Sequence, residues 1–443
     1  MRVLANQLRW HELLWVAAGQ LGSIAGVAVG VRVITGLLAP GAYGEVALDI
    51  TVATLMAQVA LGPIGHAAER FFASASEAGE LPAFVNSMRR QLKRASLIIL
   101  VFGGGLGGCA WIIAPEQAAA FALAATVFAL LSGAESVFDS TQNAARQRII
   151  VALHQALRSW LRPALIAVMV LYFGPSSMAA ILGYTFASAI VLTSQVVAFR
   201  RRIDRQRSFA RPAALNADLH GDMVRYASPF VVWGALAWIQ SSSDRWALQL
   251  FNTPTEVGLY AVVYQLGAYP IAILFSTIGQ IAAPAIFAIA GDATDRARVH
   301  SAIRWVASIA AGLLLTGAAV AAVTVAAHGA IFALLVAPQY ASVSYLLPLA
   351  VLSSIFLNVG YVIGWIALVL RRPKLLLASR VGSAALTLLL NGAGAFFLGL
   401  PGVLAAGVVS AAAYCGWTIL TCVRAARSSS VSTIYVRGEA DAR

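Results

Sequence analysis

The chain has 443 residues, of which 60% are hydrophobic and 11% are charged. Ordinary soluble domains carry about 25% charged residues, and a single soluble core stops growing beyond roughly 250–300 residues. This composition excludes a soluble enzyme, a disulfide-rich secreted domain and a disordered protein, and it predicts a polytopic membrane protein. The three cysteines lie inside apolar runs without a CxxC motif, so neither a disulfide framework nor a zinc site is expected.

Apolar runs recur along the whole chain and predict an all-α protein with about twelve transmembrane helices. Barrel strands would instead alternate polar and apolar residues. The predicted spans are residues 13–38, 43–64, 96–114, 117–141, 149–173, 176–199, 226–251, 256–285, 300–326, 340–370, 374–397 and 401–424.

Lys and Arg are distributed asymmetrically among the segments that connect these spans. The N-terminal segment, alternate loops and the C-terminal tail together hold 24, whereas the other set of loops holds none. This is the pattern of the positive-inside rule, so we expect both termini in the cytoplasm and an even number of spans. The rule also accounts for most of the net charge of +13 without a nucleic-acid partner.

The longest polar stretch divides the spans into two sets of six. We therefore predict a cytoplasmic N-terminus (1–12), an N-lobe with spans one to six (13–199), a basic cytoplasmic linker (200–225), a C-lobe with spans seven to twelve (226–424) and a disordered cytoplasmic tail (425–443). Another long inner loop, residues 65–95, contains an apolar helical face beside basic residues. This pattern is typical of either a helix on the membrane surface or a solvated connector.

The two halves carry a similar motif. Arg32 is followed by VITGLLAPGAYGEVAL and Arg245 by WALQLFNTPTEVGLYAVV, at an offset of 213 residues. Each motif reads as an arginine near the outer end of a helix, a Pro-containing turn and a Gly-containing start of the next helix. Because each half has an even number of spans, the similarity predicts parallel repeats, two bundles around a central cavity and transport by alternating access.

Arg225 and Arg304 lie at cytoplasmic helix ends, where their side chains can reach water. Five other arginines fall inside the predicted spans, where a charge persists only beside a partner or a polar cavity. Arg32 and Arg245 lie near outer ends, Arg158 and Arg162 share one face of span five, and Arg380 lies about two turns into span eleven. If they face a cavity, that cavity suits an anion, and the planar guanidinium fork suits phosphate in particular.

Acidic residues offer the alternative of ion pairs that clamp helices together. Asp49 and Glu45 stand within plausible reach of Arg32, Glu135 and Asp139 are candidate partners of Arg158, and Asp244 precedes Arg245. Arg162 and Arg380 have no obvious partner in the sequence. Clamps and a cavity role both remain open at this point.

The order of these motifs resembles a known family. RVITGLLAPGAYGEVAL (32–48) is similar to the opening signature of the bacterial polysaccharide flippases, the Wzx-type O-antigen translocases. YASPFVVWGALAWIQSSSDRWAL (226–248) and EVGLYAVVYQLGAYP (256–270) are similar to their mid-chain signature. The resemblance covers residues 13–424, and in it Arg32 and the pair Asp244–Arg245 occupy the family's motif positions.

The resemblance implies the V-shaped fold of the multidrug/oligosaccharidyl-lipid/polysaccharide (MOP) transporters, with two six-helix lobes, in the bacterial inner membrane. It also implies that the substrate is an undecaprenyl-pyrophosphate-linked oligosaccharide, moved from the inner to the outer leaflet. We expect Arg32, Arg162 and Arg245 to bind its pyrophosphate, with Arg158 and Arg380 in secondary roles. Asp49 and Asp244 are expected to orient the arginines or to take up a coupling ion.

The expected partners are the lipid-linked oligosaccharide, membrane lipids, a polysaccharide polymerase and glycosyltransferases; no nucleic acid, cofactor or metal is expected. The chain has no GxxxxGK[ST] motif, so ATP does not drive transport through a P-loop. One alternative is a drug or cation exporter of the same superfamily. The other is an enzyme such as a polymerase, against which the short outer loops argue, because that chemistry needs an acid–base constellation.

Overall fold

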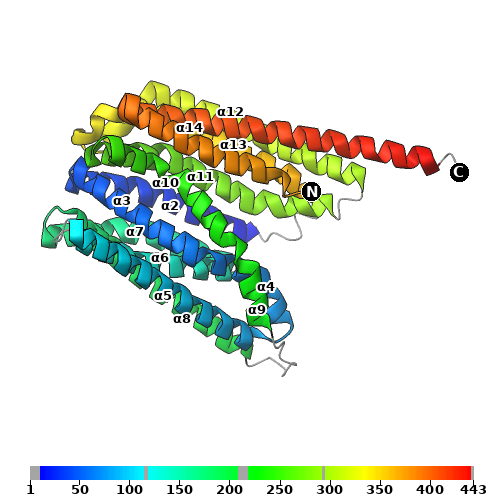
Figure 1. The fold of residues 1–443 in the computed structure, drawn as a ribbon, viewed down its shortest axis with the longest axis horizontal. Coiled ribbons are helices and arrows are strands. Elements are labelled where there is room, and N and C mark those ends of the chain that lie inside the picture. Colours follow the sequence, from blue (N-terminus) through cyan, green and yellow to red (C-terminus); the bar gives the residue numbers. More distant parts are fainter. Residues whose placement is uncertain (1–9, 114–117, 208–217, 292–294, 441–443) are drawn as a thin grey trace. The chain divides into compact units, whose positions relative to one another are not determined.

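The fold is all-helical, as predicted. A computed structural model describes residues 10–113, 118–207, 218–291 and 295–440, and every regular element in these ranges is a helix (Figure 1). The elements are α2 (Trp10–Leu37), α3 (Pro40–Ala60), α4 (Gly62–Glu77), α5 (Leu81–Ile113), α6 (Ala118–Ala144), α7 (Arg148–Phe173), α8 (Ser177–Arg207), α9 (Leu219–Ala227), α10 (Pro229–Phe251), α11 (Pro254–Ala290), α12 (Arg296–Leu335), the 3₁₀-helix η1 (Pro338–Leu346), α13 (Leu347–Val369) and α14 (Leu375–Ala440).

Within the described ranges, nine helices are long and apolar enough to cross a membrane, and α3 with α4 forms a further candidate span bent by 42°. α14 consists of two helices joined at Gly399, which has a positive φ of 62° that glycine adopts without steric cost. Pro401, two residues later, also interrupts the helical hydrogen bonding there. α10, with 23 residues, is not in this count. Each of the twelve segments predicted from the sequence therefore coincides with a helix or with half of α14.

The chain forms two compact units. The first contains the residues up to Trp246 together with Thr253–Ala261 and Leu335–Gln339, and the second contains the rest. Most of α10, the helix predicted as the first span of the C-lobe, belongs to the first unit, where two of its tryptophans bind α3; its residues after Trp246 belong to the second unit. Trp238 donates its indole N–H to the carbonyl of Thr51 at 2.6 Å, and Trp246 donates to the hydroxyl of Thr51 at 2.9 Å.

Small residues set the helix spacing in the first unit. Gly19 and Gly26 of α2 face Ala152 and Ser159 of α7 so closely that a Cβ on either glycine would stand within 3 Å of its neighbour. Close approach through small residues is the usual way in which membrane helices pack. In the second unit, by contrast, α11, α12, α13 and α14 share a cluster of buried aliphatic side chains.

The two repeat motifs meet within the first unit. A Cβ on Gly44 would lie 1.8 Å from the carbonyl oxygen of Pro254, and a Cβ on Gly258 would lie 1.9 Å from the carbonyl oxygen of Pro40. The starts of α3 and α11 therefore cross backbone to backbone, and equivalent residues of the two motifs exchange the same contact. Only glycine fits at either position.

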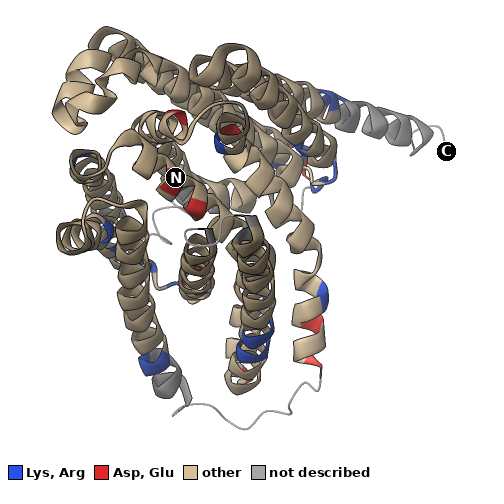
Figure 2. Ribbon diagram, turned by 60° about the vertical axis from the view of Figure 1, so that its left-hand side comes forward, with Lys and Arg blue, Asp and Glu red and all other residues tan. Residues whose placement is uncertain are grey.

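Two expectations about peripheral segments need correction. Residues 81–94 belong to α5, which continues without a break into a membrane span; the apolar face of that segment, including Phe84 and Met88, is buried in protein. α14 extends to Ala440, so a helix continues through most of the tail expected to be disordered. Figure 2 shows that most of the helical surface is tan and that the Lys and Arg residues form a few separate clusters.

Candidate functional site

The first candidate site is a charge cluster among α6, α7 and α8. Arg158 of α7 places its Nε 2.6 Å from an oxygen of Glu135 and its Nη2 2.8 Å from an oxygen of Asp139. The two carboxylates are four residues apart on α6, so they lie on one face of that helix. The ion pairs expected for Arg158 are therefore confirmed, and they clamp α7 to α6.

Uncharged polar groups of α8 complete this cluster. Gln195, which is fully buried, donates from its amide nitrogen to the other oxygen of Asp139 at 2.6 Å. One turn from Arg158, the Nε2 atom of His154 lies 3.1 Å from the hydroxyl of Ser194. These partners were not predicted from the sequence, although His154, Arg158 and Arg162 recur every four residues along one face of α7.

Arg162 lies one turn beyond the clamp and has a different environment. Its guanidinium carbon stands over two aromatic rings, 5.9 Å from the centroid of Phe128 and 5.7 Å from that of Tyr184. It also lies within electrostatic reach of Glu135. A cation over a ring face is attracted by the ring quadrupole without losing its formal charge.

Arg245 is held by its own helix and by α11. Its Nη1 atom donates to the carbonyl of Ser241 at 2.8 Å and lies 3.2 Å from Asp244, which confirms the expected pair. Tyr260 donates its hydroxyl to the second oxygen of Asp244, and its ring lies 5.5 Å from the Arg245 guanidinium carbon. Asp244 and Tyr260 together fix the direction of this arginine.

Arg32 has a partner that the sequence did not predict. This exposed residue donates to the backbone carbonyl of Val336, and no ion pair within the described ranges involves it. Glu45 instead accepts a hydrogen bond from Ser177 at 2.6 Å. The expected pairing of Arg32 with Glu45 or Asp49 is therefore wrong.

Polar groups of the same turn bind the segment that holds Arg32. Thr35 accepts a hydrogen bond from the backbone N–H of Ala337 at 3.1 Å. Gln339 donates to the carbonyls of Thr35 and Leu38, both at 2.9 Å. The outer end of α2 is thus fastened to residues 335–339 by a set of backbone-directed hydrogen bonds.

Asp49 is a buried carboxyl group inside α3. Its side chain is 8% exposed, and its Oδ2 atom has no hydrogen-bond partner among the described residues. Burying a carboxylate without compensation is costly, so such a group is held neutral or is matched to a cation in another state. Of the seven candidate residues, Asp49 is the one placed as a solitary acid.

Arg380 is the one candidate in the second unit. Its guanidinium carbon lies 5.4 Å from the ring centroid of Tyr361, which in turn meets Tyr414 edge to face at 5.5 Å. Arg380 stands beside a row of buried polar side chains on α14, spaced four residues apart. This polar row was not predicted from the sequence despite its regular spacing; it consists of Ser379, Ser383, Thr387 and Asn391.

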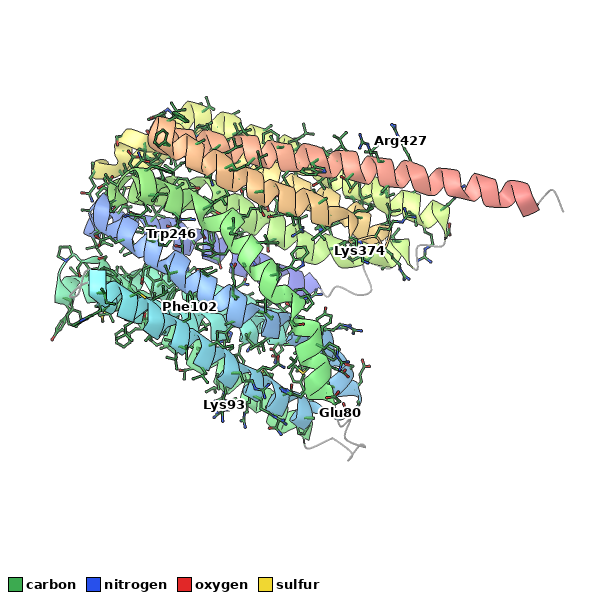
Figure 3. All side chains as sticks on the ribbon, in the orientation of Figure 1. Glu80, Lys93, Phe102, Trp246, Lys374 and Arg427 are labelled. Atoms are coloured by element: carbon green, nitrogen blue, oxygen red, sulfur yellow. The ribbon has the colours of Figure 1, made fainter. Side chains whose placement is uncertain are left out.

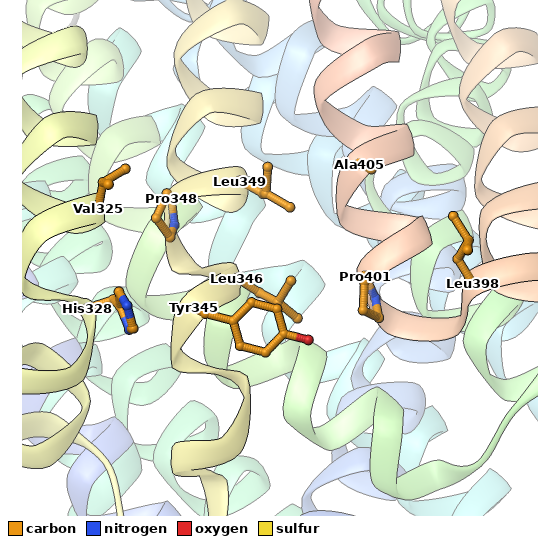
Figure 4. A pocket seen from close by; sticks show the side chains of 9 residues that line it. All are labelled: Val325, His328, Tyr345, Leu346, Pro348, Leu349, Leu398, Pro401 and Ala405. Atoms are coloured by element: carbon orange, nitrogen blue, oxygen red, sulfur yellow. The ribbon is translucent and has the colours of Figure 1, made fainter.

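The second unit also contains a pocket of about 710 Å³ among α12, η1, α13 and α14 (Figure 4). Its wall is mainly aliphatic, with the two prolines Pro348 and Pro401. His328 contributes a polar group and lies 3.1 Å from Ser344 through its Nδ1 atom. No predicted arginine lines this pocket, so it is separate from the proposed anion site.

Metal binding has no support in the structured part of the chain, where no three His, Cys, Asp or Glu side chains gather as a metal site would require. Glu135, Asp139 and Asp244 instead form ion pairs with arginines. The arrangement provides cationic and aromatic surfaces inside a helical bundle.

No protein-family profile and no curated protein matches the chain. Solved structures do match. The lipid II flippase MurJ, in an inward closed conformation, has a TM-score of 0.69 at 10% identity, covering 93% of this chain and 87% of that chain. An inward-facing multidrug resistance MATE family transporter of the MOP superfamily has a TM-score of 0.64 at 13% identity, covering 94% and 98%. The chain has the fold of the MOP superfamily transporters.

A further MOP superfamily transporter, from Pyrococcus furiosus, matches with a TM-score of 0.60 at 12% identity, covering 94% of this chain and 96% of that chain. The similar structures therefore include both a lipid flippase and multidrug transporters. Together with the apolar helices, they establish a multi-pass membrane protein with a transporter fold.

Proposed function

We propose that the protein is a flippase of the Wzx type, which moves an undecaprenyl-pyrophosphate-linked oligosaccharide from the inner to the outer leaflet of the bacterial inner membrane. In this proposal both termini are cytoplasmic, and transport proceeds by alternating access through a basic central path. A polysaccharide polymerase and glycosyltransferases act beside it.

One observation carries the proposal: three intramembrane arginines are each held over a tyrosine ring. These are Arg162 over Tyr184, Arg245 over Tyr260 and Arg380 over Tyr361, at 5.4–5.7 Å. Moving an uncompensated charge into hydrocarbon costs on the order of 20 kcal/mol in the Born limit, so a pyrophosphate headgroup needs cations along its path. The guanidinium fork donates two parallel hydrogen bonds to one phosphate group.

The contacts divide the seven candidate residues by role. Arg162, Arg245 and Arg32 are the proposed pyrophosphate ligands, and Arg380, which lies in the second unit, is a proposed secondary ligand. Arg158 acts mainly as a clamp, because its guanidinium already contacts two carboxylates. Asp244 orients Arg245.

Asp49 is the proposed site of the coupling ion. A buried carboxyl whose Oδ2 atom has no partner can take up a proton or a cation when its surroundings open to water. An ion gradient, substrate consumption or both would then drive transport.

The test is alanine substitution at Arg32, Arg162 and Arg245, with Arg304→Ala as the matched control. Arg304 is an exposed arginine in the first turns of α12. Each hydrogen bond between charged groups contributes about 1.5–3 kcal/mol, so each ligand variant should reduce flipping by roughly tenfold or more. Surface polysaccharide and flipping in proteoliposomes are measured at equal expression. Unchanged flipping in all three ligand variants would exclude these residues as the site.

A second function, export of cationic drugs, is favoured by Asp49 alone, because a buried lone carboxyl is also a suitable cation ligand. Asp49→Asn distinguishes the two functions. In a flippase this variant slows polysaccharide export and leaves drug sensitivity unchanged. In an exporter it raises drug sensitivity and leaves surface polysaccharide intact.

A further inference from the structure

The exposed face of α5 carries four basic residues within two turns. Arg89, Arg90, Lys93 and Arg94 are all exposed, and Figure 3 shows Lys93 pointing outward from this helix. On the opposite face, Phe84 and Met88 are buried. Because the buried face is fixed against protein, the basic face is held outward with a constant orientation.

The same face continues directly into side chains that are exposed and apolar. Leu97, Ile98 and Val101 are 61%, 60% and 68% exposed, and α5 has no break between them and Lys93. In a multi-pass membrane protein, large exposed aliphatic side chains on a spanning helix face lipid. The basic residues therefore lie on a lipid-facing surface and not on a solvated loop.

The depth of these residues follows from helix geometry. With a rise of 1.5 Å per residue, Lys93 stands about 6 Å along the axis from Leu97. The headgroup region on each side of the hydrocarbon core is about 5–8 Å thick. The basic side chains consequently reach the level of the lipid phosphates, in the leaflet that the charge pattern assigns to the cytoplasmic side.

The local electrostatics leave this surface positive. No ion pair within the described ranges involves the four basic residues. Asp218 stands at the start of the neighbouring helix α9, which carries His220. Partial burial and the charges of Arg90 and Arg94 lower the pKa of His220, while Asp218 acts in the opposite direction. His220 Nδ1 lies 2.9 Å from Ser87 Oγ, which joins α9 to the flank of α5.

We propose that this basic face of α5 is a binding surface for the phosphate headgroups of anionic phospholipids in the inner leaflet. Two or more headgroups bind along the helix, with arginine forks on their phosphates and with acyl chains against Leu97 and Val101. The surface is a stable contact with specific lipids, beyond the role of basic residues in topology. It does not depend on what the protein transports.

The chain offers a matched control. Arg371, Arg372 and Lys374 connect α13 to α14 and are equally exposed, but they lie in a turn and not on a helix face that continues into lipid. Neutralising them removes a similar charge from the same side of the membrane. A purely non-specific attraction would respond to both sets of substitutions alike.

The experiment compares lipid binding by three purified full-length proteins in detergent: native, R89Q/R90Q/K93Q/R94Q and R371Q/R372Q/K374Q. Native mass spectrometry counts bound phosphatidylglycerol and, separately, phosphatidylcholine. Each Lys or Arg near a membrane surface contributes about 1 kcal/mol, equivalent to about fivefold in affinity. We expect retention of phosphatidylglycerol to fall at least 100-fold in the α5 variant and to change less than fivefold in the control variant.

Further arms make the result decisive. The charge-retaining variant R89K/R90K/R94K should keep most of the binding, which separates loss of charge from misfolding. Inorganic phosphate at the lipid concentration should not displace phosphatidylglycerol, since a free anion gains nothing from the apolar part of the face. Equal retention of phosphatidylcholine, equal loss in the control variant, or full displacement by phosphate would each overturn the proposal.

Discussion

Substitution of Arg158 by alanine separates a structural clamp from a substrate ligand. In the native protein its guanidinium contacts Glu135, whose side chain is 1% exposed, and Asp139, which is largely buried. Removing one partner of a buried ion pair costs about 3–5 kcal/mol, because the remaining charge loses its compensation. Whole domains are stable by only about 5–15 kcal/mol, so this loss is a large part of the total.

The rescue variant combines Arg158→Gln with Glu135→Gln and Asp139→Asn. It removes the charges together and keeps side chains that can form hydrogen bonds, so most of the lost stability should return. Thermal unfolding in detergent is measured for the native protein, the single variant and the triple variant. Flipping is then measured at a temperature at which all three are folded.

Two outcomes discriminate between the roles. A clamp predicts a large fall in melting temperature for Arg158→Ala, its recovery in the triple variant and substantial flipping by that variant. A melting temperature unchanged in Arg158→Ala, together with loss of flipping, would refute the clamp and make Arg158 a substrate ligand.

Two further predictions concern helix contacts. Gly44→Ala should lower the free energy of unfolding by about 1–3 kcal/mol or more, because the added Cβ would lie 1.8 Å from a backbone carbonyl oxygen. Gly104→Ala is the control: its Cβ would meet nothing within 4 Å, so thermal unfolding should not change. Partial burial and the charges of Arg90 and Arg94 lower the pKa of His220 from its ordinary value of 6.5. A detached α9 therefore binds a proton more readily, so hydrogen-exchange protection of α9 should fall as the pH drops below about 6.5. His220→Gln should abolish this dependence, and protection that rises at low pH would contradict it.

The sequence predicted the features that depend on neighbouring residues. Apolar runs located the helices, because membrane burial requires about twenty consecutive apolar residues. The clamp was also predictable, since a spacing of four places Glu135 and Asp139 on one helix face. The backbone contact of Arg32 was not, because Val336 is 304 positions away in the chain and a carbonyl partner leaves no mark in a charge pattern.

The continuity of α5 was missed for a different reason. A span predicted from hydropathy ends at the first charged residues. The helix itself can continue past that point if its apolar side chains pack against protein there, where in the span they face lipid. In α5, Phe84 and Met88 pack against protein while Leu97 and Val101 are exposed. The basic residues between these segments therefore mark a change of environment along one helix and not a loop.

The partners of the intramembrane arginines explain how a cation can be both held and usable. A buried carboxylate, as in the clamp at Arg158, neutralises the guanidinium. To bind such an arginine, a phosphate would have to break a buried ion pair, whose loss costs about 3–5 kcal/mol. A tyrosine ring, as at Arg162 and Arg380, attracts the cation by about 0.5–2 kcal/mol and leaves its formal charge in place. An anion can therefore displace a ring contact far more readily than it can displace a buried carboxylate. In the proposed flippase, the clamp at Arg158 would keep α6 and α7 in register, while the ring contacts would give way to phosphate during transport.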